Sequence, residues 1–322
     1  MTEKEATGAI AILAYPEEFV SMIPAWYRKP LEWIGMVRNG KVRAGHAAMA
    51  LIEKSTGAIH YADFGRYITP FGYGRTRMTE TDPELNFNFR AEFDKEGKIV
   101  NKFELFQYIY NHPEKTHGGP VMFVSLNQKI DFNSCYSFIT DMNQKGSILY
   151  NPFGSNASNC SRFVFDAILA GVKEKSQQRK LKRMSPVTSS PLGNVFHGSA
   201  EMSYEFTEDG YTEVTDTSIL RVLTTLLKKP EEKRKLINNI PKAPINSSWH
   251  FLGGVGDQAY FEQNGFDKNH IEFSKYGKDL KLTFIRRYRL VEGFNPNEIP
   301  QLIIGKNLKG FEIDERAAQL AG

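Results

Sequence analysis

The alternation and clustering of apolar positions along the chain predict a series of short strands. They lie at residues 34–37, 45–53, 58–64, 85–93 and 121–126. An Asn39-Gly40 pair, which is a strong hairpin signal, follows the first of them. The runs 45–53 and 58–64 are joined by a short polar connection, so we expect them to pair as antiparallel neighbours. This pairing places His46 and His60 on adjacent strands.

Helical spacing of apolar residues begins after residue 100. Helices are predicted at 101–111, 131–143 and 159–171. For the third helix, Ser158 or Asn159 supplies the N-cap and Gly171 supplies a stop. Cys160 is therefore expected in the first turn of that helix.

A change in composition near residues 175–190 marks a predicted boundary. The stretch 173–183 is rich in basic residues, and turn-forming Ser and Pro residues follow it. We therefore expect a core at 1–180 and an accessory module at 190–322. The module combines a helical region at 218–240 with strands at 249–290, so its predicted class is mixed helix and antiparallel strands. It contains no cysteine, and we expect a structural or substrate-gating role for it.

Composition narrows the class of protein. The 322 residues are 41% hydrophobic and 24% charged, which is the balance of a globular protein. The net charge of +4 is too small and too scattered to indicate a nucleic-acid partner. The N-terminus lacks the basic and apolar regions of a secretory signal, and no apolar run reaches the roughly 18 residues of a membrane-spanning helix. We expect a cytoplasmic protein.

The two cysteines have different surroundings in the sequence. A nucleophilic thiol must ionise below the pKa of about 8.5 of free cysteine, and both a helix N-terminus and a neighbouring histidine favour the thiolate. Cys160 has such a position, whereas Cys135 lies among aromatic residues inside a predicted helix, which indicates packing. His46, preceded by a glycine and followed by alanines, is the candidate base. For the group that fixes its ring we favour His60, with Asp63, three residues further on, as the alternative.

These motifs resemble a known family. The run from Gly45 to Ile52, the second histidine on the next strand and the later Asn159-Cys160 pair, with Phe163-Val164 after it, are similar to the circularly permuted papain-like fold of the NlpC superfamily. The branch that includes lecithin:retinol acyltransferase is the most similar. The resemblance covers roughly residues 30–172 and implies an α+β core in which an antiparallel sheet packs on the helix that carries the nucleophile. It also implies Cys160 as nucleophile, His46 as base and His60 as third member.

The predicted function is a cysteine-dependent hydrolase or acyltransferase that acts on an amide or ester through a thioester intermediate. An aromatic, glycine-rich segment at 64–74 follows the second strand, and its side chains are expected to contact a small-molecule, peptide or acyl substrate. These candidate substrate-binding residues are Tyr67, Phe71, Tyr73 and Arg75. The alternative is a catalytically inactive papain-like module that binds a ligand on this aromatic surface.

No cofactor or metal ion is predicted. His112 and His117 look like metal ligands, but no further ligand lies near them in the sequence. The glycine-rich stretch 252–256 lacks the lysine and the following helix of a phosphate-binding loop. Arg75 and Arg77 follow the aromatic segment. We expect their side chains either to be solvated or to contact an anionic group of the substrate.

Overall fold

The structure is a computed structural model, and its contacts divide the chain into two units. It describes residues 6–17, 20–21, 29, 33, 37–38, 41–42, 45–67, 69, 73–151, 154, 156–188, 190–227, 249–253, 258–267, 270–277, 280–290 and 311–313. The first unit comprises residues 1–65, 76–141 and 151–230. The second comprises residues 66–75, 142–150 and 231–322.

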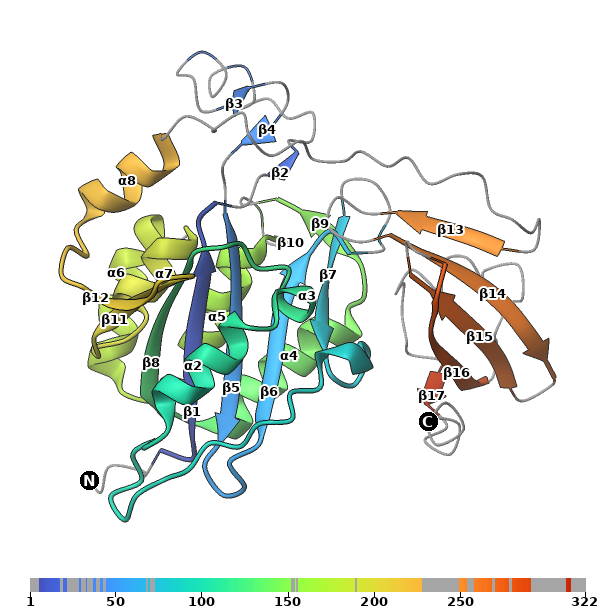
Figure 1. The fold of residues 1–322 in the computed structure, drawn as a ribbon, viewed down its shortest axis with the longest axis horizontal. Helices are drawn as coiled ribbons and strands as arrows, with labels where there is room; N and C mark the ends of the chain where they lie inside the picture. The colour runs from blue at the N-terminus through green and yellow to red at the C-terminus, as the bar shows by residue number, and fades with distance from the viewer. Residues whose placement is uncertain are drawn as a thin grey trace. The chain divides into compact units, whose positions relative to one another are not determined.

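A mainly antiparallel sheet is the framework of the first unit, with strand order β7-β6-β5-β1-β8-β11-β12 (Figure 1). The strands are β1 (Gly8–Tyr15), β5 (His46–Glu53), β6 (Ile59–Gly65), β7 (Tyr73–Met78), β8 (Met122–Ile130), β11 (Ser203–Thr207) and β12 (Gly210–Val214). Of β7, residues 76–78 belong to this unit. The predicted strands at 45–53, 58–64 and 121–126 are confirmed, and β5 pairs with β6 antiparallel as expected.

The central strand β1 was not expected from the sequence. All its residues are buried, and it pairs with β5 on one side and β8 on the other. Because helices cover both faces of the sheet, this strand is apolar throughout instead of alternating. A periodicity of two, the usual strand signal, is therefore missing from it.

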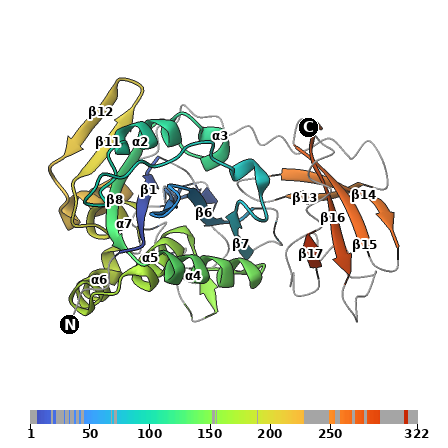
Figure 2. The same cartoon turned by 90° about the horizontal axis from the view of Figure 1, so that it is seen from below.

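Helices pack on both faces of this sheet. Figure 2 shows α2 (Lys102–Tyr110) and α3 (Pro113–Thr116) on one side, and α4 (Phe132–Gln144) and α5 (Cys160–Gly171) on the other. The first side holds a hydrophobic core, a cluster in which Leu105 and Phe106 of α2 and Tyr61 of β6 are fully buried. The α+β class, with an antiparallel sheet packed on the helix that carries Cys160, is thus confirmed.

The remaining elements of the first unit are short. They are the 3-10 helix η1 (Pro83–Leu85), β10 (Ala157–Ser158), α6 (Lys175–Thr188), α7 (Pro191–His197), α8 (Ile219–Leu227), and a small sheet of β2 (Val20–Ser21), β4 (Lys41–Val42) and β3 (Val37–Arg38). The pairing of β3 with β4 agrees with the hairpin expected at Asn39-Gly40. Of the predicted helical region 218–240, the described part is α8.

The predicted boundary near residue 180 does not match the division of the chain. Strand β11 pairs with β8 of the main sheet, with Ser203 opposite Ser125, and β12 pairs with β11. Residues 190–214 are therefore part of the core layer, although a turn-rich sequence precedes them. Turn residues at 185–193 indicate a change of direction, which a chain can make within one domain as well as between two.

The predicted strand at 85–93 is wrong. Its apolar residues alternate, and Leu85, Phe87 and Ala91 are buried in the core beside α2. In the structure η1 ends at Leu85, and Phe93 makes only an isolated bridge to Ile99. The alternation reflects an extended segment buried on one side, without the neighbouring strand that would make it part of a sheet.

The second unit contains a separate antiparallel sheet of strand order β13-β14-β15-β16-β17. Its strands are β13 (Trp249–Gly253), β14 (Gln258–Phe266), β15 (His270–Tyr276), β16 (Leu282–Leu290) and β17 (Phe311–Ile313). The expectation of strands over 249–290 is confirmed for the described residues. Phe261 and Phe273, on neighbouring strands, are buried. In this unit β9 (Ile148–Tyr150) pairs with the start of β7, where Tyr73 lies opposite Leu149.

Among the helices that the structure describes, none combines the length and the apolar character needed to cross a membrane.

Candidate active site

Cys160 is the first residue of α5. The side chain of Asn159 caps this helix by accepting a hydrogen bond from the Arg162 N–H at 2.8 Å. The predicted N-cap and the predicted place of Cys160 in the first turn are both found. Cys160 is buried, with 6% of the residue exposed. The unpaired N–H groups at a helix N-terminus favour a thiolate at this position.

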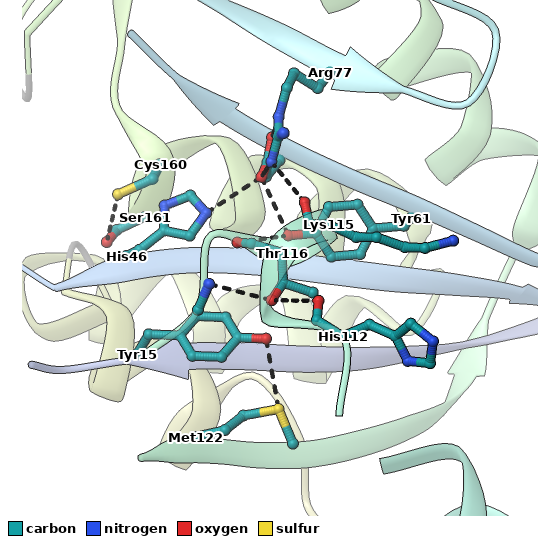
Figure 3. Close-up of polar contacts among 12 residues, drawn as sticks. Tyr15, His46, Tyr61, Arg77, His112, Lys115, Thr116, Met122, Cys160 and Ser161 are labelled. Carbon is teal, nitrogen blue, oxygen red and sulfur yellow. Dashed lines mark hydrogen bonds and ion pairs between the residues drawn. The ribbon is translucent and has the colours of Figure 1, made fainter. Parts of the chain in front are cut away.

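His46 is the first residue of β5, at the end of the sheet where α5 begins. The preceding Gly45 has φ +68°, and a Cβ there would lie 3.0 Å from the Tyr15 carbonyl oxygen. Glycine is therefore needed for the chain to turn into the strand at this point. The turn brings the His46 side chain into a hydrogen bond with the Cys160 side chain. Figure 3 shows the imidazole beside the Cys160 sulfur.

Asp63 of β6 is the group that fixes the His46 ring. Its Oδ2 lies 3.2 Å from His46 Nε2. The Asp63 side chain is fully buried, and its carboxylate also accepts a hydrogen bond from the Tyr61 hydroxyl at 3.1 Å. Cys160, His46 and Asp63 therefore form a continuous chain of contacts, the arrangement that cysteine nucleophiles share with serine nucleophiles.

Arg77 of β7 balances the buried charge of Asp63. Its Nε donates to Oδ1 at 2.9 Å and its Nη2 to Oδ2 at 2.5 Å, a two-pronged contact. Nη2 also donates to the Lys115 carbonyl oxygen at 3.2 Å. Arg77 is itself only 2% exposed, so the expectation of a solvated or substrate-binding side chain is wrong for this residue. A buried carboxylate needs such a partner because an isolated ion is strongly disfavoured away from water.

The pKa values follow from these contacts. Burial raises the pKa of Asp63, but the Arg77 charge and the hydrogen bonds from His46 and Arg77 outweigh it and hold that pKa well below its usual range. Burial lowers the pKa of His46, yet its hydrogen bonds to Asp63 and Cys160 raise the value to about 9. Charges therefore alternate in sign along this series of contacts. The Arg77 guanidinium is followed by the Asp63 carboxylate and the His46 imidazolium, and the imidazolium contacts the Cys160 thiol. This order places a positively charged imidazolium beside the Cys160 thiol.

His60 does not contact His46, which corrects the expectation for the third member of the site. Its ring packs against Phe132 and Tyr136 of α4, with centroid separations of 5.3 and 5.2 Å. Burial among these rings lowers its pKa, although Glu80 and Glu53 act in the opposite direction. The residue placed second among the sequence candidates, Asp63, occupies the position expected for His60.

The register of the β5–β6 hairpin explains this difference. Leu51 lies opposite His60, and Ala48 lies opposite Asp63. His60 is thus displaced from His46 by five positions along the strand, which is about 16 Å at 3.3 Å per residue. Counting back from the short polar connection gives the same register, so this signal was available in the sequence.

The candidate substrate-binding residues are assigned to the second unit, whereas Cys160 is assigned to the first. Tyr67 is buried, and its carbonyl oxygen accepts a hydrogen bond from Arg75 Nε at 3.0 Å. Tyr73 is 40% exposed. Phe71 lies outside the described residues. The use of these residues by a substrate stays a prediction.

Cys135 and His112, the other candidate reactive or metal-binding side chains, lie in packed surroundings. Burial, with a further contribution from Asp131, raises the pKa of Cys135 to about 12, which suits a packing role. His112 Nδ1 lies 2.7 Å from the Tyr108 carbonyl oxygen, and its ring packs on that of Tyr108. Within the described part of the chain, no group of three or more His, Cys, Asp or Glu residues is arranged to hold a metal ion.

Comparison with known proteins identifies the family. A family model described as "Type VI secretion system effector TseH-like" matches residues 10–177, which is more than half of the 322 residues. The chain belongs to this TseH-like family. The segment that defines its membership runs from β1 into α6 and contains His46, Asp63 and Cys160.

One solved structure is similar to this TseH-like chain. It is titled as the crystal structure of the type VI secretion system effector TseH, and it is 14% identical, with a TM-score of 0.38. The match covers 64% of this chain and 97% of the other. None of the curated proteins matches the chain.

Proposed function

We propose that this TseH-like effector is a cysteine hydrolase that cleaves an amide or ester through a thioester intermediate. The observation that carries the proposal is the position of His46, whose ring contacts the Cys160 thiol on one side and the buried carboxylate of Asp63 on the other. The resemblance to permuted papain-like enzymes supports it, since the strand with the histidine precedes the helix with the cysteine in the chain.

The first half of the reaction forms the thioester. The Cys160 thiolate attacks the substrate carbonyl carbon, and the carbonyl electron pair moves to oxygen. Backbone N–H groups in the first turn of α5 are placed to stabilise that oxyanion. When the tetrahedral intermediate collapses, the bond to the leaving amine or alcohol breaks, and the His46 imidazolium donates the proton that the leaving group needs.

The second half of the reaction releases the acyl group. His46, now neutral, takes a proton from a water molecule as that water attacks the thioester carbonyl. The carbon–sulfur bond breaks, a carboxylic acid leaves, and the thiolate–imidazolium pair is restored. Asp63 keeps the ring oriented and stabilises its positive charge through the bond to Nε2. An acyltransferase would follow the same steps with an alcohol or amine acceptor instead of water.

The family membership bears on where this chemistry takes place. The sequence alone predicts a cytoplasmic protein, but the family is described as one of secretion system effectors. We propose that the protein acts in a target cell after delivery and not in the cytoplasm of the cell that makes it.

The test is covalent trapping of the acyl group. Wild-type protein is incubated with a panel of activated acyl and peptidyl esters, and intact-mass and peptide mass spectrometry locate any adduct. We expect a thioester on Cys160 that disappears with Cys160→Ala and accumulates less with His46→Ala. Cys135→Ala is the matched control and should label as the wild type does. The absence of any Cys160 adduct across the panel would contradict the proposal and favour an inactive binding module.

A further inference from the structure

Helix α7 touches the candidate site from outside the segment that the family model matches. Its residue Asn194 donates a hydrogen bond from Nδ2 to the Ser161 carbonyl oxygen at 2.7 Å. At the other side of the site, a Cβ on Gly45 would lie 3.3 Å from Cγ of Pro191 in α7. This helix therefore contacts the residue that follows Cys160 and the residue that precedes His46.

The hydrogen bonding of Asn194 is one-sided. The residue is fully buried, and among the residues that the structure describes its Oδ1 has no hydrogen-bond partner. A buried amide oxygen without a partner destabilises a fold, so a leucine of similar size would be the more stable choice at such a position. An asparagine at this position provides the hydrogen bond to Ser161, which an apolar side chain cannot make.

The Ser161 carbonyl lies in the first turn of α5, where orientation matters for the thiol. The Asn159 cap holds the Arg162 N–H from the start of the helix, and Asn194 holds the turn from the side. Together the two contacts fix the direction in which the Cys160 side chain leaves the backbone. The distance and angle between the thiol and the His46 ring depend on that direction.

We infer that Asn194 is a positioning residue for Cys160, and that α7, which lies beyond the family-matched segment, completes the thiol site. The inference rests on the proposed function insofar as it concerns the same thiol. It assigns no chemical step to Asn194, which acts only through the backbone of Ser161.

The chain offers a matched control for this role. Asn127 of β8 is also buried, and its Nδ2 donates to the Gly198 carbonyl oxygen at 2.9 Å, immediately after α7. Each asparagine thus donates a side-chain hydrogen bond to a backbone carbonyl oxygen, Asn194 from within α7 and Asn127 to the residue that follows α7. Only one of these bonds reaches the helix that carries Cys160.

The experiment compares the wild type with Asn194→Leu, Asn194→Ala and Asn127→Ala in the full chain. Iodoacetamide alkylation of Cys160 is followed by peptide mass spectrometry from pH 5 to 10, and urea unfolding measures stability. For Asn194→Leu we expect stability equal to or above that of the wild type, with alkylation at pH 7 slowed at least about tenfold and its pH midpoint raised. Asn194→Ala should also slow alkylation, whereas Asn127→Ala should lose stability and keep the wild-type pH midpoint.

An unchanged rate and midpoint in Asn194→Leu would overturn the inference, as would an equal change in Asn127→Ala. These outcomes are distinguishable from failure of the proposed function. If wild-type Cys160 reacts rapidly with a His46-dependent pH profile and Asn194→Leu slows that reaction, but no acyl adduct forms, the hydrolase proposal fails and the positioning role stands. If acyl transfer occurs and Asn194→Leu retains the wild-type profile, the positioning role fails and the hydrolase proposal stands.

Discussion

Removing the positive charge of Arg77 should destabilise the first unit strongly. Asp63 is fully buried, and Arg77, itself 2% exposed, is the cation that holds both of its carboxylate oxygens. Arg77→Met keeps much of the aliphatic length but leaves the carboxylate without this partner. Breaking a buried ion pair from one side costs about 3–5 kcal/mol. The remaining bonds from His46 and Tyr61 offset part of that, so we expect a loss of about 3 kcal/mol.

Urea unfolding at pH 7 measures this loss, and two further variants sharpen it. Arg162→Met removes a partly exposed guanidinium that lies 3.7 Å from Asp166, so its effect should stay within about 1 kcal/mol. The double variant Arg77→Met, Asp63→Asn should be more stable than Arg77→Met alone, because the buried charge is gone. If Arg77→Met costs no more than Arg162→Met, the carboxylate is not the buried, balanced charge that the account requires.

Three further predictions concern the surroundings of the site. The rise of the His46 pKa from 6.5 to about 9 corresponds to about 3 kcal/mol of stability, fully present below pH 6.5 and lost as pH rises through about 9. An ionised Cys160 has the opposite pH dependence, so urea unfolding is compared in Cys160→Ala with and without His46→Gln. The loss of stability above pH 6.5 should be steeper where His46 is present, and equal slopes would contradict this. His60→Phe keeps the ring packing on α4 and should leave Cys160 alkylation unchanged; slowed alkylation would restore His60 to the site. Gly45→Ala forces a Cβ into a backbone with φ +68°, 3.0 Å from the Tyr15 carbonyl oxygen, and should destabilise by at least about 1 kcal/mol in thermal unfolding. An unchanged melting temperature would show that the turn tolerates a side chain.

The parts of the fold with local signals could be predicted from the sequence. The capped helix that begins at Cys160 and the β5–β6 hairpin are determined by residues close together in the chain, and both are found. Strand β1 could not be recognised, because a strand covered on both faces is apolar throughout and has no period of two. Segment 85–93 was wrongly predicted as a strand for the opposite reason. Its apolar residues alternate because one side of the segment is buried, and such burial does not require a neighbouring strand.

The candidate site divides in the same way. Cys160 and His46 carry their own local signals, a helix start and a strand entered through glycine. Asp63 required the hairpin register to be counted residue by residue. Arg77 and Asn194 lie on elements whose neighbours depend on the tertiary fold, so nothing near them in the sequence indicates a partner at Asp63 or Ser161.

The most direct test of the central claim, a thiol at Cys160 activated by His46, is the pH dependence of alkylation at each cysteine. Both cysteines are followed in one sample by peptide mass spectrometry, so that Cys135, whose pKa is raised to about 12, serves as the internal reference. We predict that Cys160 reaches its full alkylation rate well below the pKa of about 8.5 of a free thiol, and that His46→Ala moves its pH midpoint upward. A Cys160 that reacts as slowly as Cys135, or whose pH midpoint is the same in His46→Ala, would contradict it.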